Sequence, residues 1–166
     1  MAEEIKPAEI VAVKDEQCEE LLEAGQASSE EITFESFINN SSKGSLKLIE
    51  MHFWKGRSVT YYDEIQVNQQ GRTLQRGTRS EGVKFGLVYT DGVDADAADA
   101  RKFVVAIDSL TNKIYAETGP IGPIDWNVVE VKLGMAEDKV VYEDPILGGK
   151  VEGQMHHIMA FVTVYN

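Results

Sequence analysis

Hydrophobic side chains recur at every second residue from Ile32 onward, and this alternation constrains the fold more than any other feature of the chain. Ile32, Phe34 and Ile38 alternate with polar neighbours, which is the pattern of a strand with one buried face. Gly, Asn, Asp and Pro separate such segments, as they do between short strands. We therefore expect about nine strands, at residues 32–38, 45–54, 58–62, 83–89, 103–108, 113–118, 126–133, 139–142 and 158–165.

No long helical pattern lies between these segments, so nothing could serve as the crossover that neighbouring parallel strands need. Many short strands separated by turns are typical of an all-β sandwich or barrel. We predict an antiparallel β-sandwich at residues 32–166, preceded by a short helical or flexible acidic extension at residues 1–31. Within residues 45–54 the alternation changes phase between Leu48 and Ile49, which predicts a β-bulge.

The N-terminal extension differs from the rest of the chain in charge. Of the net charge of −12, residues 1–35 carry −9, from eleven acidic and two basic side chains. Residues 15–24 could form a short helix with Cys18, Leu21 and Leu22 on one side, although so little apolar contact is marginal for a helix alone. The sequence leaves open whether this segment is a flexible, solubilising tail or a helix docked on the domain.

The N-terminus has neither the basic nor the apolar region of a secretory signal. No apolar run reaches the roughly 18 residues that a membrane-spanning helix needs. Cys18 is the only cysteine, so the chain cannot form an internal disulfide. These observations predict a cytoplasmic protein without a transmembrane segment.

Nucleic acid is not an expected partner, because phosphate binding requires clustered basic side chains that outweigh a protein's own negative field. Residues 71–82 do contain Arg72, Arg76 and Arg79, so this segment could bind an anion or a sulfated glycan. A long polar hairpin loop is the interpretation that we prefer for it.

No motif in the sequence points to a metal site or a catalytic centre. His156 and His157 are adjacent, so in a strand they would point to opposite faces and would be poorly placed to share a zinc ion. An acidic loop lacks the glycine and the closing glutamate of an EF-hand, and its four aspartates are Asp91, Asp94, Asp96 and Asp99. Nucleophile-elbow and phosphate-loop motifs are also absent. We expect no enzyme activity, no cofactor and no metal.

The only two tryptophans, Trp54 and Trp126, lie beside loops that contain Gly or Pro. Such a tryptophan is either a core anchor or a stacking platform for a sugar or a lipid head group. The residues that we predict to bind a ligand are Trp54, Tyr61, Tyr62 and Trp126. Residues 32–38 and 158–165 are expected to be edge strands, and unprotected edges favour pairing between copies, so a homo-oligomer is an open prediction.

Several short motifs, spread over residues 33–165, resemble the plant jasmonate-induced proteins. The motifs are Phe37-Ile38-Asn39-Asn40-Ser41-Ser42 with Gly44 and Leu46, Trp54 with Gly56, Ile65 with Gln70-Gly71, Gly86-Leu87-Val88-Tyr89, Asn112-Lys113-Ile114-Tyr115-Ala116-Glu117, and Asp125-Trp126. The resemblance implies a role in stress and defence responses of plants, and it implies no defined molecular activity.

The order of elements also resembles the actinoporin-like sandwiches, which include pore-forming toxins and fungal lectins. In both, an N-terminal segment precedes a β core, and a central strand is followed by a loop with a tryptophan, here at residues 119–127. This resemblance implies membrane docking through exposed aromatic side chains, of which the loop offers Trp126 alone. It also implies insertion of the N-terminal segment into lipid, which the −9 charge of residues 1–35 opposes.

From these observations we predict a non-enzymatic, stress- or defence-related binding protein with a lectin-like or small-ligand site. The alternative hypothesis is an actinoporin-like protein that binds membranes or forms pores. The expected partner is accordingly a carbohydrate or a lipid head group. A third hypothesis is an enzyme whose site is assembled from positions that no motif reveals.

Overall fold

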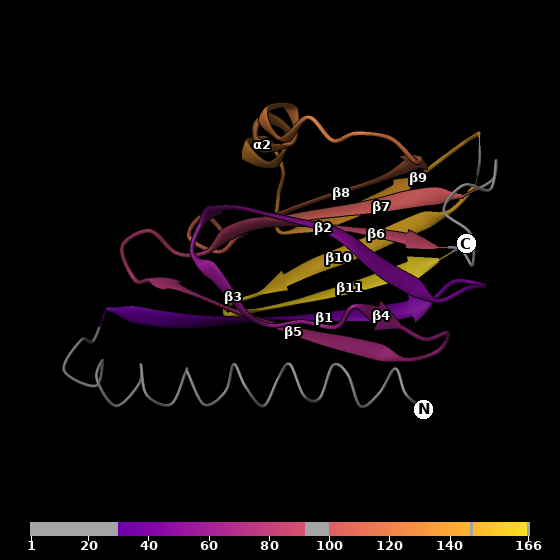
Figure 1. Ribbon diagram of the computed structural model, residues 1–166. Helices are drawn as coiled ribbons and strands as arrows, with labels where there is room; N and C mark the ends of the chain where they lie inside the picture. The colour runs from indigo at the N-terminus through magenta and orange to yellow at the C-terminus, as the bar shows by residue number, and fades with distance from the viewer. Residues whose placement is uncertain (1–29, 92–99, 147, 166) are drawn as a thin grey trace.

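The computed structural model describes residues 30–91, 100–146 and 148–165. Over these residues two β-sheets pack face to face, and one helix, α2 (Trp126–Gly134), lies on the outside of one sheet (Figure 1). All strand pairs in the described part of the chain are antiparallel except the pair of β1 and β11. The predicted antiparallel β-sandwich is confirmed.

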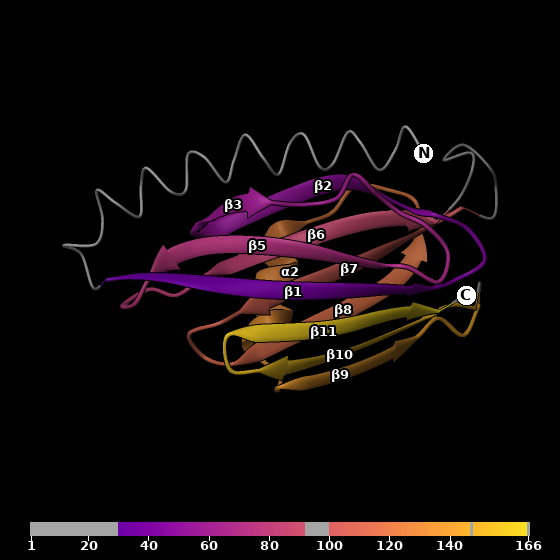
Figure 2. The same ribbon diagram turned by 90° about the horizontal axis from the view of Figure 1, so that it is seen from below.

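One sheet has six strands and the other has five. Figure 2 shows the six-stranded sheet in front, with α2 behind both layers. The six-stranded sheet runs in the order β3 (Arg57–Thr60), β5 (Gln70–Thr78), β1 (Glu31–Ser41), β11 (Met159–Tyr165), β10 (Lys150–His156) and β9 (Lys139–Glu143). The five-stranded sheet runs in the order β4 (Glu64–Ile65), β2 (Leu46–Lys55), β6 (Lys84–Asp91), β7 (Arg101–Asp108) and β8 (Lys113–Pro120).

The first and the last strand of the domain lie side by side in the middle of the six-stranded sheet. β1 and β11 pair in parallel, with Phe37 opposite Phe161, and β5 and β10 flank them. The prediction that residues 32–38 and 158–165 are edge strands is therefore wrong. The whole domain connects the two strands, so this parallel pair needs no crossover helix, and neither strand offers a free edge to a second copy.

Inward-facing side chains of the two sheets form one hydrophobic core. Phe85 of β6 packs edge-to-face against Phe34 of β1, with 6.2 Å between ring centroids, and stacks on Phe53 of β2 at 5.6 Å. Tyr89 of β6 is fully buried, and this desolvation raises the pKa of its hydroxyl. The core thus joins the centre of one sheet to the centre of the other.

The alternation of hydrophobic residues does not reveal three strands, the two-residue β4 and the longer β5 and β10. The inward positions of β5 include Gly71, Thr73 and Gln75, which are buried although they are small or polar. In β10, the side chain of Ile114 from the opposite sheet takes the space that a Cβ atom of Gly153 would need. Most of residues 71–82 is therefore a central strand, and the preferred interpretation of this segment as a hairpin loop is wrong.

Residues 126–133, predicted as a strand, form the helix α2. Asp125 caps it, since its Oδ1 accepts hydrogen bonds from the backbone N–H groups of Asn127 at 3.1 Å and Val128 at 3.3 Å. Val129 and Leu133 lie one turn apart on the side that faces the sheet, and both are buried. The β-branched residues favour a strand locally, but the cap and the packing on the sheet stabilise a helix.

Other local predictions have mixed outcomes. The bulge in β2 is confirmed by a register shift between Leu48 and Glu50. The carboxylate of Asp91, a residue of the candidate calcium loop, accepts a hydrogen bond from the backbone N–H of Arg101 at 3.3 Å and lies 3.7 Å from its Nε. The other three aspartates of that loop, the possible helix at residues 15–24 and Cys18 lie outside the described residues.

Candidate functional site

The outer face of the five-stranded sheet carries a row of residues that are small in the middle and aromatic at both ends. The row crosses β2, β6, β7 and β8 through four residues that lie opposite one another, His52, Gly86, Ala106 and Tyr115. The small residues leave a groove in which α2 lies, and Val129 and Leu133 form a second core there with Ala106. Gly86 and Ala106 therefore determine where the helix packs.

Trp126, the first residue of α2, lies directly over Gly86. A Cβ atom on Gly86 would overlap with the six-membered ring of the indole. The indole Nε1 donates a hydrogen bond to Oε1 of Glu50 at 3.1 Å. The sheet thus fixes both the position and the orientation of this tryptophan.

Three rings, those of His52, Trp54 and Trp126, form what we call the aromatic cluster. His52 stacks on Trp126 with 4.8 Å between centroids and an interplanar angle of 9°. Trp54 meets both rings edge-on, at 4.8 Å from His52 and 5.7 Å from Trp126. All three side chains are half-buried, so the cluster is partly a packing core and partly an accessible surface.

Lysine side chains lie over the aromatic rings of this face. Lys84 Nζ is 5.7 Å from the ring centroid of Trp54 and 2.7 Å from Oε2 of Glu130. Lys132 Nζ lies 5.7 Å from the ring centroid of Tyr115. Burial, with a contribution from Glu117, raises the pKa of the Tyr115 hydroxyl. These rings therefore accept cations on their faces.

The side of α2 that points away from the sheet is also apolar. Val128, Val131 and Met135 lie at spacings of three and four residues, and their exposed fractions are 45%, 62% and 75%. We call these three residues the α2 apolar surface.

Lysines hold both ends of this helical segment. Lys102 Nζ donates hydrogen bonds to the carbonyl oxygens of Gly122 at 3.2 Å and Pro123 at 3.4 Å, and Lys113 Nζ donates to the carbonyl of Gly134. These bonds satisfy carbonyl groups in the loop before α2 and at its C-terminal end. The α2 apolar surface is consequently presented on an anchored segment.

The structure brings together two of the four residues predicted to bind a ligand. Trp54 and Trp126 meet in the aromatic cluster, whereas Tyr62 packs against the main core between the sheets. Tyr61 is half-buried in the connection between β3 and β4. The sequence does not reveal His52, because its stacking on Trp126 depends on where α2 packs in the fold. It does not reveal the exposed valines of α2 either, because the prediction of a strand at residues 126–133 hides their helical spacing.

The anion-binding candidate at residues 71–82 is largely neutralised within the protein. Arg72 Nε lies 3.0 Å from Oε2 of Glu35, and Arg76 Nη1 lies 3.3 Å from Oε2 of Glu31. Across the described ranges, no three His, Cys, Asp or Glu side chains are close enough to hold a metal ion.

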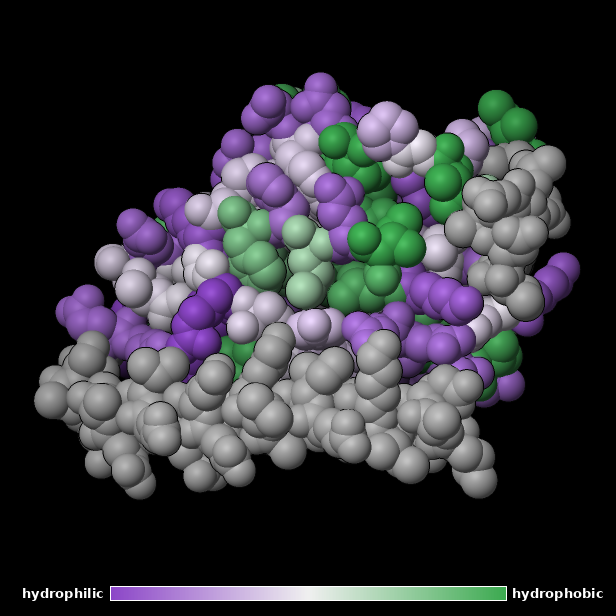
Figure 3. Space-filling view, in the orientation of Figure 1, coloured by the Kyte–Doolittle hydropathy of each residue, from purple (hydrophilic) through white to green (hydrophobic). Residues whose placement is uncertain are grey.

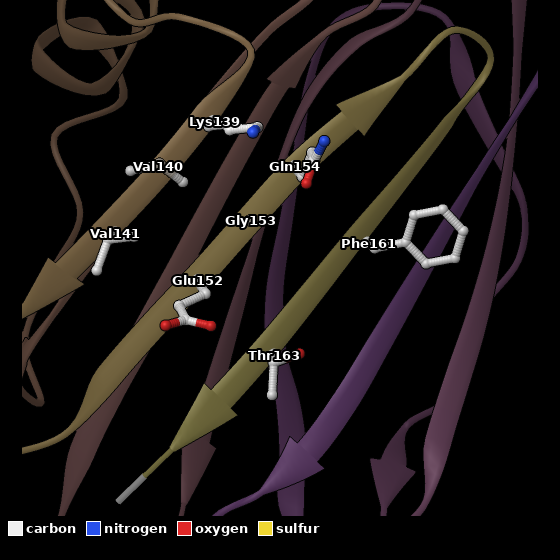
Figure 4. Close-up of a pocket in the computed structure, with 8 residues that line it drawn as sticks. All are labelled: Lys139, Val140, Val141, Glu152, Gly153, Gln154, Phe161 and Thr163. Carbon is white, nitrogen blue, oxygen red and sulfur yellow. The ribbon is translucent and has the colours of Figure 1, made fainter.

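On the opposite side of the sandwich, the described residues of the six-stranded sheet line a pair of shallow depressions. One has a volume of about 380 Å³ and lies across β9, β10 and β11 (Figure 4). Figure 4 shows Lys139, Glu152, Gln154 and Phe161 around it. The second, of about 440 Å³, lies at the end of β1 and β11 and shares Thr163 with the first.

Comparison with solved structures identifies the same fold in the crystal structure of the lipid binding protein Nakanori. The TM-score is 0.66 at 12% sequence identity, over 91% of this chain and 78% of Nakanori. The structure of IP-1A from Alcaligenes faecalis also matches, with a TM-score of 0.41 and 12% identity, over 81% of this chain and 90% of that one. No protein-family model matches the sequence, and neither does any curated protein. No described helix is long and apolar enough to cross a membrane.

Proposed function

We propose that this chain is a non-enzymatic, actinoporin-like protein that binds lipid at the surface of a membrane through the α2 apolar surface. The observation that carries the proposal is the fold shared with the lipid binding protein Nakanori over 91% of the chain. The fold alone does not locate a lipid site, so the surface is argued from this protein's own side chains.

The α2 apolar surface has the composition that a lipid interface favours. Val131 and Met135 are 62% and 75% exposed, and large apolar side chains grouped on one helix face mark an interaction surface. Figure 3 shows that hydrophobic side chains also gather in the middle of the face seen there, bordered by hydrophilic ones. An amphipathic helix that lies flat on lipid would bury such side chains among the acyl chains.

Charge favours a zwitterionic lipid over an anionic one. The chain carries a net charge of −12, which repels an anionic bilayer. Lys84 and Lys132 are paired with Glu130 and Glu117, so these two lysines do not form a basic patch. The aromatic cluster adds ring faces on which an ammonium group can lie, as Lys84 does over Trp54. The choline head group of a zwitterionic lipid contains such a cation, a quaternary ammonium group.

Co-sedimentation with phosphatidylcholine vesicles tests the proposal. The wild type should bind, and the double variant Val131→Ser, Met135→Ser should bind at least about ten-fold more weakly, because two exposed apolar side chains are lost. The matched control is Val141→Ser, Ile146→Ser, whose residues are 64% and 89% exposed away from α2. Addition of phosphatidylserine should weaken binding. Equal loss of binding in both double variants would reject the proposal. So would a wild type that binds neither phosphatidylcholine vesicles nor vesicles of sphingomyelin, the other common lipid with a choline head group.

We do not extend the proposal to pore formation, because residues 1–35 carry a charge of −9 that resists burial in lipid. Vesicles loaded with a dye should bind the protein without leaking, and removal of residues 1–29 should leave binding intact. The carbohydrate site at Trp54, Tyr61, Tyr62 and Trp126, the homo-oligomer, the cytoplasmic location and the resemblance to jasmonate-induced stress proteins stay predictions.

A further inference from the structure

The depression at the end of β1 and β11 differs from the rest of the surface in its chemistry. It has a volume of about 440 Å³, within the range of small-molecule sites. Its lining comes from the end of β1, the turn before β5 and the end of β11, and consists of Asn39, Asn40, Ser41, Asn68, Gln69, Gln70, Thr163 and Tyr165. All eight residues are polar, and none carries a charge in a chain of which 27% of residues are charged.

An uncharged amide-rich lining selects for a neutral, hydrogen-bonding ligand. An Asn or Gln amide that is not already bonded offers two donors and one acceptor oxygen, so it matches neighbouring hydroxyl groups that donate and accept at once. Asn40 is not such an amide, because its Nδ2 donates to the carbonyls of Gly44 and Ile65 and its Oδ1 accepts from the backbone N–H of Ser42. An anion would find no positive side chain in this lining, and a cation would find no carboxylate. A purely apolar ligand would leave the amides of Asn68 and Gln69 without hydrogen bonds.

Part of this lining is held in place before any ligand binds. Gln70 Nε2 donates to Oδ1 of Asn39 at 2.8 Å, and Asn39 Nδ2 donates to the carbonyl of Val162 at 3.3 Å. Asn68 adopts a positive φ of 62°, and its backbone N–H bonds to the carbonyl of Asn40 at 2.8 Å. Within the described residues, the side chains of Asn68 and Gln69 make no hydrogen bond, so their amide groups remain available.

Tyr165 supplies an aromatic ring beside these amides. Its hydroxyl donates to Oε2 of Glu152 at 3.3 Å, and Lys150 Nζ lies 5.3 Å from its ring centroid. These contacts fix the ring, whose face can pack against the C–H groups of a ligand. A pyranose sugar has hydroxyl groups around its edge, which the amides can bind, and C–H groups on its faces, which can pack against the ring of Tyr165.

We propose that this depression, which we call the amide pocket, binds a neutral saccharide, either as a free glycan or as the head group of a glycolipid. It is formed by the six-stranded sheet, whereas the α2 apolar surface lies on the five-stranded sheet. The inference is therefore independent of the lipid-binding proposal, and either can fail alone.

The experiment is an amide NMR titration of the full chain with glucose, galactose, mannose and N-acetylglucosamine at millimolar concentrations. At least one sugar should shift the backbone amides of Asn68, Gln69 and Gln70, and sialic acid should not. Gln69→Ala should weaken this binding roughly three- to ten-fold, as expected for the loss of one or two neutral hydrogen bonds. Gln154→Ala, on the same sheet but outside the amide pocket, is the matched control and should leave the binding unchanged.

A second pair of variants separates ring stacking from hydrogen bonding. Tyr165→Leu should weaken binding, whereas Tyr165→Phe, which keeps the ring, should retain most of it. Phosphatidylcholine vesicles with and without lactosylceramide distinguish a glycolipid from a free glycan as the source of the sugar, with Gln69→Ala as the control for the pocket. No shift with any of the four sugars, or equal weakening by Gln69→Ala and Gln154→Ala, would overturn the inference.

Discussion

The two outer faces of the sandwich differ in the size of the side chains at their centres. On the five-stranded sheet, the row from His52 to Tyr115 has Gly86 and Ala106 in the middle, and α2 packs into the groove that these small residues leave. On the six-stranded sheet, the corresponding central position holds two phenylalanines, Phe37 and Phe161, stacked 5.2 Å apart on neighbouring strands. Phe161 remains 39% exposed there.

The comparison teaches that side-chain size at the centre of a face decides what can cover it. Small residues in the sheet allow the close approach of the helix that buries Val129 and Leu133. Large rings at the centre stand above their sheet and leave room for depressions beside them, such as the one across β9, β10 and β11 that Phe161 lines. One face therefore stabilises the fold with a helix, while the other presents a ligand-sized surface.

The largest expected effect comes from loosening the helix. Leu133→Ala removes a side chain that is 0% exposed, and it should lower the free energy of unfolding by about 3 kcal/mol. Urea denaturation followed by circular dichroism measures this loss. Val131→Ala on the outward side of the same helix is the control and should change the stability by less than about 0.5 kcal/mol. Equal losses would mean that α2 does not pack as described.

A methyl group in the groove tests the same contact from the sheet. Gly86→Ala places a Cβ atom against the indole of Trp126, and overpacking of this kind should cost about 2 kcal/mol. A matched substitution in the same sheet is Gly119→Ala, where a Cβ atom would have no neighbour within 4 Å. Thermal unfolding of the two variants gives the comparison, together with the fluorescence of Trp126. A neutral Gly86→Ala would show that the indole can move freely.

A smaller effect is expected on the uncovered face. Phe161→Ala removes a partly exposed ring and its stacking on Phe37, so it should cost about 1 kcal/mol. A double-mutant cycle with Phe37→Ala, measured by urea denaturation, isolates the coupling between the rings. If Phe161→Ala were as harmful as Leu133→Ala, the described difference between the two faces would be wrong.

The smallest effect concerns one ion pair beside the amide pocket. A hydrogen bond from Lys150, 2.7 Å away, lowers the pKa of Glu152 against a smaller opposing effect of desolvation. The folded state therefore favours the carboxylate, so its contribution to stability is present above the unfolded pKa and is lost as pH falls through the folded pKa. An NMR titration should find that Lys150→Met moves the Glu152 pKa back up towards its ordinary value. Lys139→Met, on the neighbouring strand β9, should move it much less.

Particular residues show how far the sequence could predict this molecule. The alternation at Ile32, Phe34 and Ile38 identifies β1 correctly, because the residues of a half-buried strand are alternately apolar on the buried face and polar on the other. The alternation fails for β5, whose inward Thr73 and Gln75 are polar. It also misassigns residues 126–133. Val128, Val129 and Val131 favour a strand locally, but packing on the five-stranded sheet stabilises a helix. The sequence could place Trp54 and Trp126 beside loops, but not against each other.

The chain itself determines that it forms stacked β-sheets behind an acidic extension, because period-two burial and the positions of charge are local properties of the sequence. Only the tertiary structure decides that β1 lies beside β11, that α2 is a helix, and that eight uncharged polar residues surround one depression. Each of these depends on contacts between residues far apart in the chain. Those contacts depend on how the shapes of distant side chains fit together, and the pattern of apolar and polar residues along the sequence does not predict this fit.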